Sequence, residues 1–543
     1  MTPQIADLCF PYITQTKADI VAQYYPNRPQ GQIVTRIAPS PTGFVHLGAL
    51  YTGLINLKFA HQQWGIFMLR IEDTDQQRLI ENGVQIMIDG LSHFDIIADE
   101  WPKKWWKYGP YIQSERKLIY QILAKDLIAQ GKAYPCFLTT EEIEQTRSIQ
   151  TAGKQLPGIY GNFAPYRNKS YQEIKDLIDA GKPFVIRLLS STQADERVEY
   201  IDLIKWPISA QANINDIVLI KSDGLTTYHF AHIVDDYLMG TTHVIRADER
   251  VPSVPLHIQL HQAMRGSVPR WHYAHVAPLL KSDQWGKRKL SKRKDPEADV
   301  MYLIQSAYPT EAIKEYLMTI IDSKYEDWKK ENHTRSYREY EICLEDMNVA
   351  GALVDMLKLR DISKEYCASL SAEQLYTQFV DWYHLGFSED KEIGWYLDTY
   401  HNLILSALQI ERWDILKDPK RFVTYHDVIN HIRPFIDELY DHMQSPALSL
   451  SSDIVQEFIS AYIPSLDLTV SKESWFENLK MIWSQLGYAS NNQEYKTGNY
   501  KGKIWDLAMV LRILLFKSSQ TPDLYESMQV MGIERVKQRL SSS

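Results

Sequence analysis

Cysteine is scarce in this sequence, and the few cysteines it has are far apart. The 543 residues include four of them, Cys9, Cys136, Cys343 and Cys367, and no two form a C-x-x-C pair. This spacing excludes a disulfide framework and a zinc knuckle, and it is typical of a reducing compartment. We therefore expect a cytoplasmic protein.

Long apolar runs are also missing. No stretch approaches the roughly 18 uninterrupted apolar residues of a membrane span, and the richest one, Leu507 to Phe516, is interrupted by Arg512. Met1 to Ile20 lacks a basic segment followed by an apolar one. We therefore expect no membrane-spanning helix, no secretory signal peptide and no membrane partner.

The sequence has no excess of positive charge, because 59 Lys and Arg against 68 Asp and Glu give a net charge of −9. This excludes a protein that coats nucleic acid through its overall charge. It leaves open a basic groove on an acidic body, since phosphate binding depends on local charge. Hydrophobic residues at 45% and charged residues at 23% are typical of a globular protein and exclude wholesale disorder.

A strand–turn–helix–strand pattern begins near residue 33. Ile33 to Ala38 is a short apolar run typical of a strand, and the two prolines within Pro39 to Gly43 end it. Leucines then recur at three- and four-residue spacing from Leu47 to Leu57, as on one face of a helix. Ile66 to Ile71 is typical of a second strand. The pattern predicts a βαβ unit and hence a parallel sheet.

The predicted secondary structure changes twice along the rest of the chain. Residues from about 110 to 220 mix helical and strand-like stretches, which predicts an α+β insertion. Thr227 to Leu238 and His243 to Ile245 have sheet-like patterning, and beyond about residue 300 the sequence is almost wholly helical. The predicted fold class is therefore α/β: a Rossmann-like parallel-sheet domain with an α+β insertion, followed by an all-helical C-terminal region.

The turn between the first strand and its helix is a candidate anion site. A chain that leaves a parallel strand, turns tightly and enters a helix directs free N–H groups and the helix dipole at a ligand. His46 supplies an imidazole donor there, and Gly48 lets a nucleotide approach the backbone. A bare H-x-G-x pattern is usually a plain turn with a surface histidine, but the preceding Pro39 to Gly43 favours the functional interpretation.

A second candidate is the basic segment Lys281 to Lys294, with seven Lys and Arg among fourteen residues. Such a run is usually a solvated charged loop. The alternative is a mobile clamp that stabilises the charge of a polyphosphate leaving group. Its core would be Lys289 to Arg293.

These two segments resemble the signatures of class I aminoacyl-tRNA synthetases. Pro39 to Ala49 resembles the HIGH-type motif, and Lys289 to Arg293 resembles the KMSKS-type loop. Further segments in family order narrow the resemblance to glutamyl-tRNA synthetases of the bacterial type, and it covers roughly residues 33 to 540. These segments are Arg36 to Gly43, Arg70 to Asp75, Gln113 to Arg116, Lys221 to Gly224, Thr227 to Ala231, Asp235 to Asp236, Val244 to Arg246 and Tyr500 to Leu540.

The resemblance implies a ligase that attaches L-glutamate to tRNA(Glu) through a glutamyl-adenylate and releases AMP and pyrophosphate. The glutamate α-carboxylate attacks the α-phosphate of ATP, and the terminal adenosine hydroxyl of the tRNA then takes the glutamyl group. Neither step needs a covalent protein nucleophile, so catalysis would depend on positioning and on neutralising phosphate charge. ATP and Mg²⁺ are implied as cofactors, and we expect a monomer. Some family members also charge tRNA(Gln), and the sequence leaves that alternative open.

The resemblance also implies roles for individual residues. The catalytic set is His46, Lys289, Ser291 and Lys292. The ATP-binding set is Ser40, Thr42, His46, Gly48, Glu249 and Lys292. The glutamate-binding set is Arg36, Ala38, Ser40, Glu72, Tyr228, His232 and Arg246. Guanidinium groups suit the two carboxylates of glutamate, and an anion suits its ammonium group.

The sequence departs from the family pattern at several positions. Arg250 stands where many members have tryptophan, and His232 stands where asparagine is more common. Some members bind zinc through four cysteines in the insertion, but here only Cys136 remains, with Leu138 in place of a second thiolate. Because four ligands cannot be assembled, we expect no structural zinc.

By the resemblance, the chain divides into six parts. They are an N-terminal extension (1–32), the first half of the catalytic domain (33–112), an acceptor-stem-binding insertion (113–220), the second half of the catalytic domain (221–260), a stem-contact region with the KMSKS-type loop (261–365) and a helical anticodon-binding region (366–543).

The sequence argues against four other functions. A truncated relative that glutamylates a modified tRNA base lacks the anticodon-binding region, and this chain is too long for it. A glutaminyl-tRNA synthetase would have β-barrels in its C-terminal part, where this sequence has helical periodicity. A non-catalytic tRNA-binding paralogue would have lost His46 or the lysines of the Lys289 to Arg293 segment, and all are present. A small-metabolite adenylyltransferase would leave residues 300–543 without a role.

Overall fold

The computed structural model describes residues 2–24, 28–41, 43, 45–75, 79–103, 107–267, 269, 271–291, 293–412, 421–498 and 500–542. Two predicted site residues, Thr42 and Lys292, lie outside these ranges. The chain forms two compact units. Unit 1 comprises Met1–Tyr302 and Leu317–Asp355, and unit 2 comprises Leu303–Tyr316 and Met356–Ser543.

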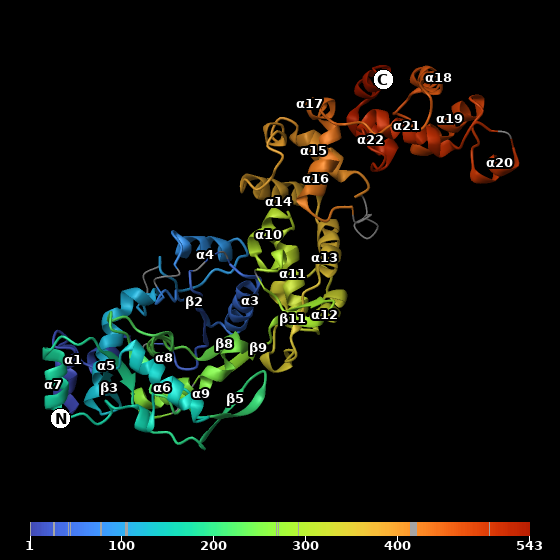
Figure 1. Ribbon diagram of the computed structural model, residues 1–543. Helices are drawn as coiled ribbons and strands as arrows, with labels where there is room; N and C mark the ends of the chain where they lie inside the picture. Colours follow the sequence, from blue (N-terminus) through green and yellow to red (C-terminus); the bar gives the residue numbers. More distant parts are fainter. Residues whose placement is uncertain are drawn as a thin grey trace. The chain divides into compact units, whose positions relative to one another are not determined.

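Unit 1 contains the predicted βαβ unit (Figure 1). Strand β1 (Val34–Ile37) pairs in parallel with β2 (Ile66–Leu69), and helix α3 (Leu47–His61) connects them. Strand β8 (His243–Ala247) lies next to β1 and pairs in parallel with β9 (His272–Val276). These strands are almost wholly buried, as expected for parallel strands covered on both faces. The predicted α/β class with a parallel sheet is confirmed.

The insertion is an α+β structure. Its antiparallel sheet has the order β3 (Ala133–Cys136), β4 (Val185–Leu188), β7 (Val218–Ile220), and its helices are α5 (Lys117–Ala129), α6 (Thr140–Ala152) and α7 (Tyr171–Asp179). Strands β5 (Arg197–Asp202) and β6 (Trp206–Gln211) form a hairpin. The end of β5 pairs with β9 through Asp202 and Tyr273, so this hairpin joins the sheet that contains β8.

The N-terminal residues contribute to the core of unit 1 and do not form a separate extension. Helix α1 (Thr2–Cys9) packs against α5 and α7, and α2 (Lys17–Tyr24) packs against α5. Ile5, Cys9 and Ile20 are buried in the same apolar cluster as the α5 side chains. These helices therefore cover one face of α5.

The prediction of sheet-like structure for Thr227 to Leu238 was wrong. Tyr228–Leu238 is helix α8, in which all residues from Phe230 to Leu238 are buried. Its polar residues His232, Asp235 and Asp236 recur at three- and four-residue spacing, as on one helix face, and the strand prediction overlooked this signal. The strand expected at His243 to Ile245 is present as β8.

The basic segment is a β-hairpin over much of its length and not a simple loop. Strand β10 (Leu279–Asp283) pairs antiparallel with β11 (Gly286–Lys289), and β12 (Ala352–Leu353) pairs with β10 in parallel. Several of its cations form ion pairs, among them Lys281 with Glu297 and Arg288 with Asp295 at 2.6 Å. Acidic residues of unit 1 therefore neutralise part of this positive charge.

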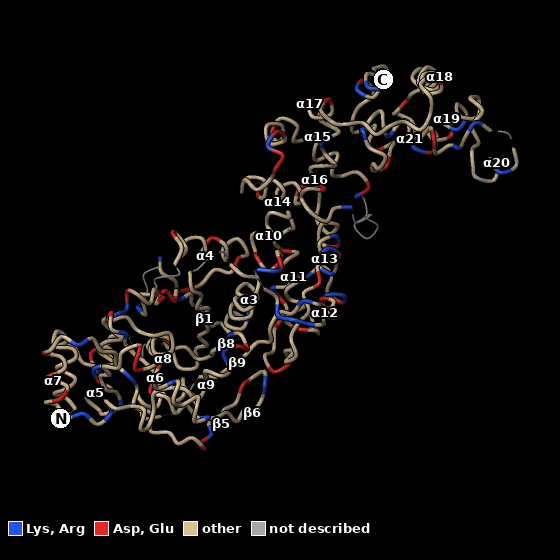
Figure 2. Tube along the Cα trace, viewed as in Figure 1, with Lys and Arg blue, Asp and Glu red and all other residues tan. Residues whose placement is uncertain are grey.

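Unit 2 is helical, as predicted (Figure 1). Its helices are α13 (Met356–Ser369), α14 (Ala372–His384), α15 (His401–Gln409), α16 (Tyr425–Ile432), α17 (Asp437–Asp441), α18 (Ser452–Tyr462), α19 (Lys472–Gln485), α20 (Asn492–Thr497), α21 (Ile504–Phe516), α22 (Leu524–Met531) and α23 (Ile533–Ser541). Phe458, Trp483 and Leu511 are buried in its core. Figure 2 shows basic and acidic residues interspersed along these helices.

The remaining helices belong to unit 1 or are divided between the units. In unit 1 they are α4 (Gly83–Ser92), α9 (Val254–Arg265) and α12 (Tyr325–Glu331), whereas the residues of α10 (Val300–Gln305) and α11 (Thr310–Ile321) are shared. Within the described ranges, no helix has the length and apolar character needed to cross a membrane.

Candidate active site

A cavity of about 560 Å³ lies at the carboxyl ends of the parallel strands of unit 1. Its walls come from the residues that end or follow β1, β2, β8 and β9, together with the first turn of α3 and the start of α8. The carboxyl ends of parallel strands are where α/β sheets bind ligands, because the connections diverge there and leave a crevice.

Most of the predicted site residues line this cavity. They are Arg36, Ala38, His46, Gly48, Glu72, Tyr228, His232, Arg246, Glu249 and Lys289. Ser40 and Ser291 are not among the lining residues. Ser40 is exposed, and the backbone N–H of Ser291 donates to Asp295. Thr42 and Lys292 lie outside the described residues.

Arg36 is paired with a buried carboxylate of α8. Its Nε and Nη2 donate to the two oxygens of Asp236 at 3.0 and 3.1 Å, and Arg70 Nη1 donates to the same carboxylate at 2.8 Å. Burial opposes ionisation of Asp236, but Arg36, His232 and Arg70 outweigh it and hold the pKa of Asp236 well below its usual range. The positive charge of Arg36 is therefore compensated within the protein.

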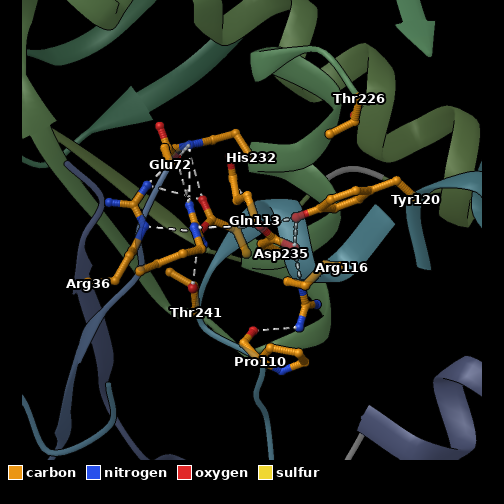
Figure 3. Close-up of polar contacts among 12 residues, drawn as sticks. Arg36, Glu72, Pro110, Gln113, Arg116, Tyr120, Thr226, His232, Asp235 and Thr241 are labelled. Carbon is orange, nitrogen blue, oxygen red and sulfur yellow. Dashed lines mark hydrogen bonds and ion pairs between the residues drawn. The ribbon is translucent and has the colours of Figure 1, made fainter. Parts of the chain in front are cut away.

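Glu72 and His232 form a second polar pair (Figure 3). Glu72 Oε1 lies 3.2 Å from His232 Nδ1 and accepts from Arg70 Nη2 at 3.3 Å. Burial alone would raise the pKa of Glu72, but His232, Arg70 and Arg36 lower it, so the side chain is a carboxylate. Burial lowers the pKa of His232, and its Nε2 lies 3.1 Å from Arg36 Nη2. A neutral ring with its proton on Nδ1 satisfies both contacts.

Arg246 differs from Arg36 because, among the described residues, its hydrogen-bond partners are imidazoles and a carbonyl and include no carboxylate. Its guanidinium contacts His275 Nε2 at 3.0 Å, His257 Nδ1 at 3.2 Å, His232 Nε2 at 3.3 Å and the Arg250 carbonyl at 3.2 Å. The residue is only 7% exposed, and burial lowers its pKa. A buried cation is costly unless it is paired. Arg246 therefore provides a place in the cavity wall for an anionic ligand group.

Arg250 occupies a different position on the same wall. Its guanidinium lies 4.7 Å from the centre of the Tyr228 ring, a cation–π arrangement. Burial raises the pKa of the Tyr228 hydroxyl, which therefore stays protonated. Arg250 stands where the family pattern often has tryptophan, so a cation stacked on tyrosine forms this part of the cavity wall.

The first turn of α3 is capped by a side chain of the candidate site. His46 is the N-cap residue, and its Nδ1 accepts from the Gly48 N–H at 2.8 Å. In the neutral ring the proton then lies on Nε2, which is a hydrogen-bond donor. A Cβ at Gly48 would come within 3.1 Å of His46 Nδ1, so the glycine allows the histidine to cap the helix. On the opposite wall, Lys289 forms an ion pair with Glu249.

Sequence reasoning missed the side chains that hold the predicted ones in place. Arg70 and Asp236 lie in quoted motifs but received no role, and His257 and His275 were not singled out. One signal for Asp236 was available, since it follows His232 by four residues and shares a helix face with it. The incorrect strand prediction for Thr227 to Leu238 concealed that relation.

Comparison with known proteins identifies the family of the part of the chain that contains this cavity. The family model described as tRNA synthetases class I (E and Q), catalytic domain, matches residues 32–339, which contain all the residues that line the cavity. The chain belongs to this family. It is therefore a class I tRNA synthetase, and its family uses ATP.

Two similar proteins are named glutamate–tRNA ligases. The glutamate–tRNA ligase of Clostridium perfringens is 40% identical over 99% of each chain, and that of Acetivibrio thermocellus is 38% identical over 99% of this chain and 98% of its own. A solved glutamate tRNA ligase of Elizabethkingia meningosepticum, in complex with its amino acid, has a TM-score of 0.73 and 27% identity. That similarity covers 94% of this chain and 99% of the solved one.

The described residues include no group of three or more His, Cys, Asp or Glu side chains placed to hold a metal ion. Cys136 is buried in β3, and Cys343 is the exposed cysteine. The absence of structural zinc stays a prediction, which metal analysis of the purified protein tests directly.

Proposed function

We propose that the protein is a glutamate–tRNA ligase that forms glutamyl-adenylate from glutamate and ATP and transfers the glutamyl group to tRNA(Glu). The observation that carries this proposal is the similarity to glutamate–tRNA ligases over nearly the whole of both chains. The cavity supports it, because its charges complement those of glutamate.

In this proposal, glutamate occupies the part of the cavity between Arg246 and Glu72. A substrate carboxylate would give Arg246 the ion pair that it lacks among the described residues. Glu72 is ionised and lines the cavity, so it suits the substrate ammonium group. Arg36 and His232 would hold these two groups at fixed positions, and Ala38, Ser40 and Tyr228 complete the proposed glutamate site.

ATP would bind at the first turn of α3 and beside the β10–β11 hairpin. His46 can donate from Nε2 to a phosphate oxygen, and the α3 N-terminus favours negative charge. We assign Ser40, Thr42, Gly48 and Glu249 to the same nucleotide site, and Lys289, Ser291 and Lys292 to the departing pyrophosphate. The cavity carboxylates already have cationic partners, such as Lys289 on Glu249, so Mg²⁺ would be bound mainly by the ATP phosphates.

Both proposed reaction steps use oxygen nucleophiles of the substrates. The glutamate carboxylate attacks the α-phosphorus and displaces pyrophosphate, and the tRNA hydroxyl then attacks the adenylate carbonyl and displaces AMP. The protein contributes position and charge. Holding the reacting groups together lowers the entropic barrier, and fixed cations stabilise the negative charge that develops on the phosphates.

Aminoacylation with labelled substrates tests this proposal. The purified protein should charge tRNA(Glu) with labelled glutamate in the presence of ATP and Mg²⁺, and should not charge it with labelled glutamine. We also expect ATP–pyrophosphate exchange with glutamate to be weak until tRNA is added. Charging by glutamine, or no charging by glutamate, would contradict the proposed function.

The same assay extends to the partners. Purified tRNA(Gln) offered with labelled glutamate separates an enzyme specific for tRNA(Glu) from one that also charges tRNA(Gln). We further propose that the protein acts as a cytoplasmic monomer, for which light scattering of the purified protein at working concentration is the direct measurement of the oligomeric state.

A further inference from the structure

Arg246 is connected to the insertion by a line of buried side chains. Its Nε donates to His275 Nε2 at 3.0 Å, and His275 Nδ1 lies 2.5 Å from Asp202 Oδ2. Both His275 and Asp202 are fully buried at 0% exposure, and neither lines the cavity. Asp202 ends strand β5, so the line runs from the β5–β6 hairpin to the cavity wall.

The partners of His275 determine which of its ring nitrogens carries the proton. Burial alone would raise the pKa of Asp202, but the hydrogen bond from His275 and the N–H groups of Lys205 and Ile204 lower it, so Asp202 is ionised. Burial lowers the pKa of His275, which keeps its ring neutral. The Nδ1–H then donates to Asp202, and Nε2 accepts from Arg246.

The opposite tautomer would set two donors against each other. With its proton on Nε2, His275 would oppose the Nε–H of Arg246 across 3.0 Å. Arg246 would have to turn away, and its remaining N–H groups would no longer point at the same place. Asp202 therefore influences the direction of the guanidinium without touching it.

We propose that Asp202 and His275 are positioning residues for Arg246, which orient its guanidinium toward the carboxylate of the bound glutamate. This inference rests on the proposed role of Arg246 in the proposed function. It predicts that the two residues control the affinity for glutamate and leave the affinity for ATP nearly unchanged.

Asp202→Asn tests the tautomer with almost no change of shape. Asp202 Oδ1 accepts the N–H groups of Ile204 and Lys205, both at 3.0 Å, so the asparagine oxygen would stay on these donors. Its NH₂ group would then face His275 Nδ1 and force the proton onto Nε2. We expect the KM for glutamate to rise roughly tenfold to hundredfold, by analogy with the loss of a carboxylate that supports a metal-ligating histidine, while the KM for ATP changes less than about twofold.

Two further comparisons separate this effect from general damage. Asp216→Asn alters another buried carboxylate of the insertion, which bonds Arg167 at 2.6 Å and lies away from the cavity. It should lower the thermal stability without raising the KM for glutamate. His275→Gln keeps an oxygen acceptor for Arg246, whereas His275→Leu keeps none, so the glutamine variant should retain more of the affinity for glutamate.

Arg246→Ala, measured beside these variants, distinguishes a failure of the positioning role from a failure of the proposed function. If it raises the KM for glutamate but Asp202→Asn and His275→Leu do not, the positioning role is overturned and the proposed function stands. If Arg246→Ala leaves the KM for glutamate unchanged, its role in the proposed function fails. If thermal unfolding shows that Asp202→Asn does not fold, His275→Gln and His275→Leu provide the test instead. Equal KM values for glutamate in these two variants would overturn the inference.

Discussion

The two cavity arginines have the same side chain but opposite electrostatic situations. Arg36 makes a two-point ion pair with Asp236, so its charge is compensated before any ligand binds. Among the described residues, Arg246 has hydrogen bonds to imidazoles and a carbonyl but no ion pair, so an arriving anion would be its first direct counter-charge. Arg246 should therefore gain more from a substrate carboxylate than Arg36, because no ion pair offsets the desolvation free energy of its charge in the free protein.

Glu72 offers a direct test of the amino-group side of the cavity. Glu72→Gln removes the negative charge that we assign to the substrate ammonium group and weakens the support from Arg70 and His232. A hydrogen bond to a charged group contributes about 1.5–3 kcal/mol. We therefore expect the KM for glutamate to rise roughly tenfold to hundredfold in steady-state pyrophosphate exchange measured with tRNA present.

Glu100→Gln is the matched control for this substitution. Glu100 is also a buried carboxylate of unit 1, paired with Arg28 at 2.8 Å, but it does not line the cavity. Its loss should lower the stability and leave the KM for glutamate unchanged. Equal effects of the two variants on KM would remove Glu72 from the substrate site.

The identities of the site residues could be predicted from the sequence, but their pairings could not. Motif resemblance indicated Arg36, Glu72 and Arg246 because each lies in a recognisable segment. The contact of Arg36 with Asp236 joins residues 200 positions apart, and that of His275 with Asp202 joins residues 73 apart. Such contacts arise when α8 and the β5–β6 hairpin pack against the sheet, and no local pattern encodes them.

Among the helices and strands, the amphipathic or well-bounded ones were predicted best. The first βαβ unit has clear leucine periodicity and turn residues at both ends, and it was predicted correctly. Helix α8 was missed although His232, Asp235 and Asp236 share one of its faces, because a short and largely apolar segment is ambiguous between helix and strand. The role of α1 and α2 could not be predicted either, since short helices gain their stability from tertiary packing, here against α5.

The turn between α3 and β2 has a steric requirement that can be tested. A Cβ at Gly65 would lie 2.5 Å from the Ile33 carbonyl oxygen and 3.0 Å from that of Ala60, both backbone atoms. Gly65→Ala should therefore destabilise unit 1 by about 1–3 kcal/mol, the usual cost of overpacking. Urea unfolding followed by circular dichroism measures the change in the free energy of unfolding.

Gly153→Ala is the corresponding control. Gly153 caps the C-terminus of α6 with φ −80°, and a Cβ there would find its nearest neighbour at 3.4 Å. We expect little loss of stability from this variant. If both alanine variants unfold at the same urea concentration, the close approach at Gly65 has no energetic consequence.

For the whole molecule, the net charge of −9 carried little information about function. Basic and acidic residues are interspersed along the chain (Figure 2), and ion pairs such as that of Arg288 with Asp295 neutralise part of the most basic segment. The charges important for the proposed function are the few that line the cavity, among them Arg246, Glu72 and Lys289. Overall composition therefore indicated a globular class, whereas the local environment of single side chains indicates the chemistry.

Buried and half-buried histidines in both units should make the stability of the molecule depend on pH. Burial lowers the pKa of His229 and His243 in unit 1, and of His431 in unit 2, each to about 4. Between about pH 6.5 and pH 4 the unfolded chain therefore binds protons that the folded chain does not, so the free energy of unfolding falls as the pH falls. A shift of this size corresponds to at most roughly 3 kcal/mol per histidine.

Differential scanning fluorimetry should show a constant unfolding temperature above about pH 7 and a steep decrease from pH 6.5 to 4.5. His431→Gln should reduce the slope for unit 2, whereas substitution of the exposed His384 of the same unit by Gln should not change it. An unfolding temperature that stays constant down to pH 5 would contradict the role of these histidines.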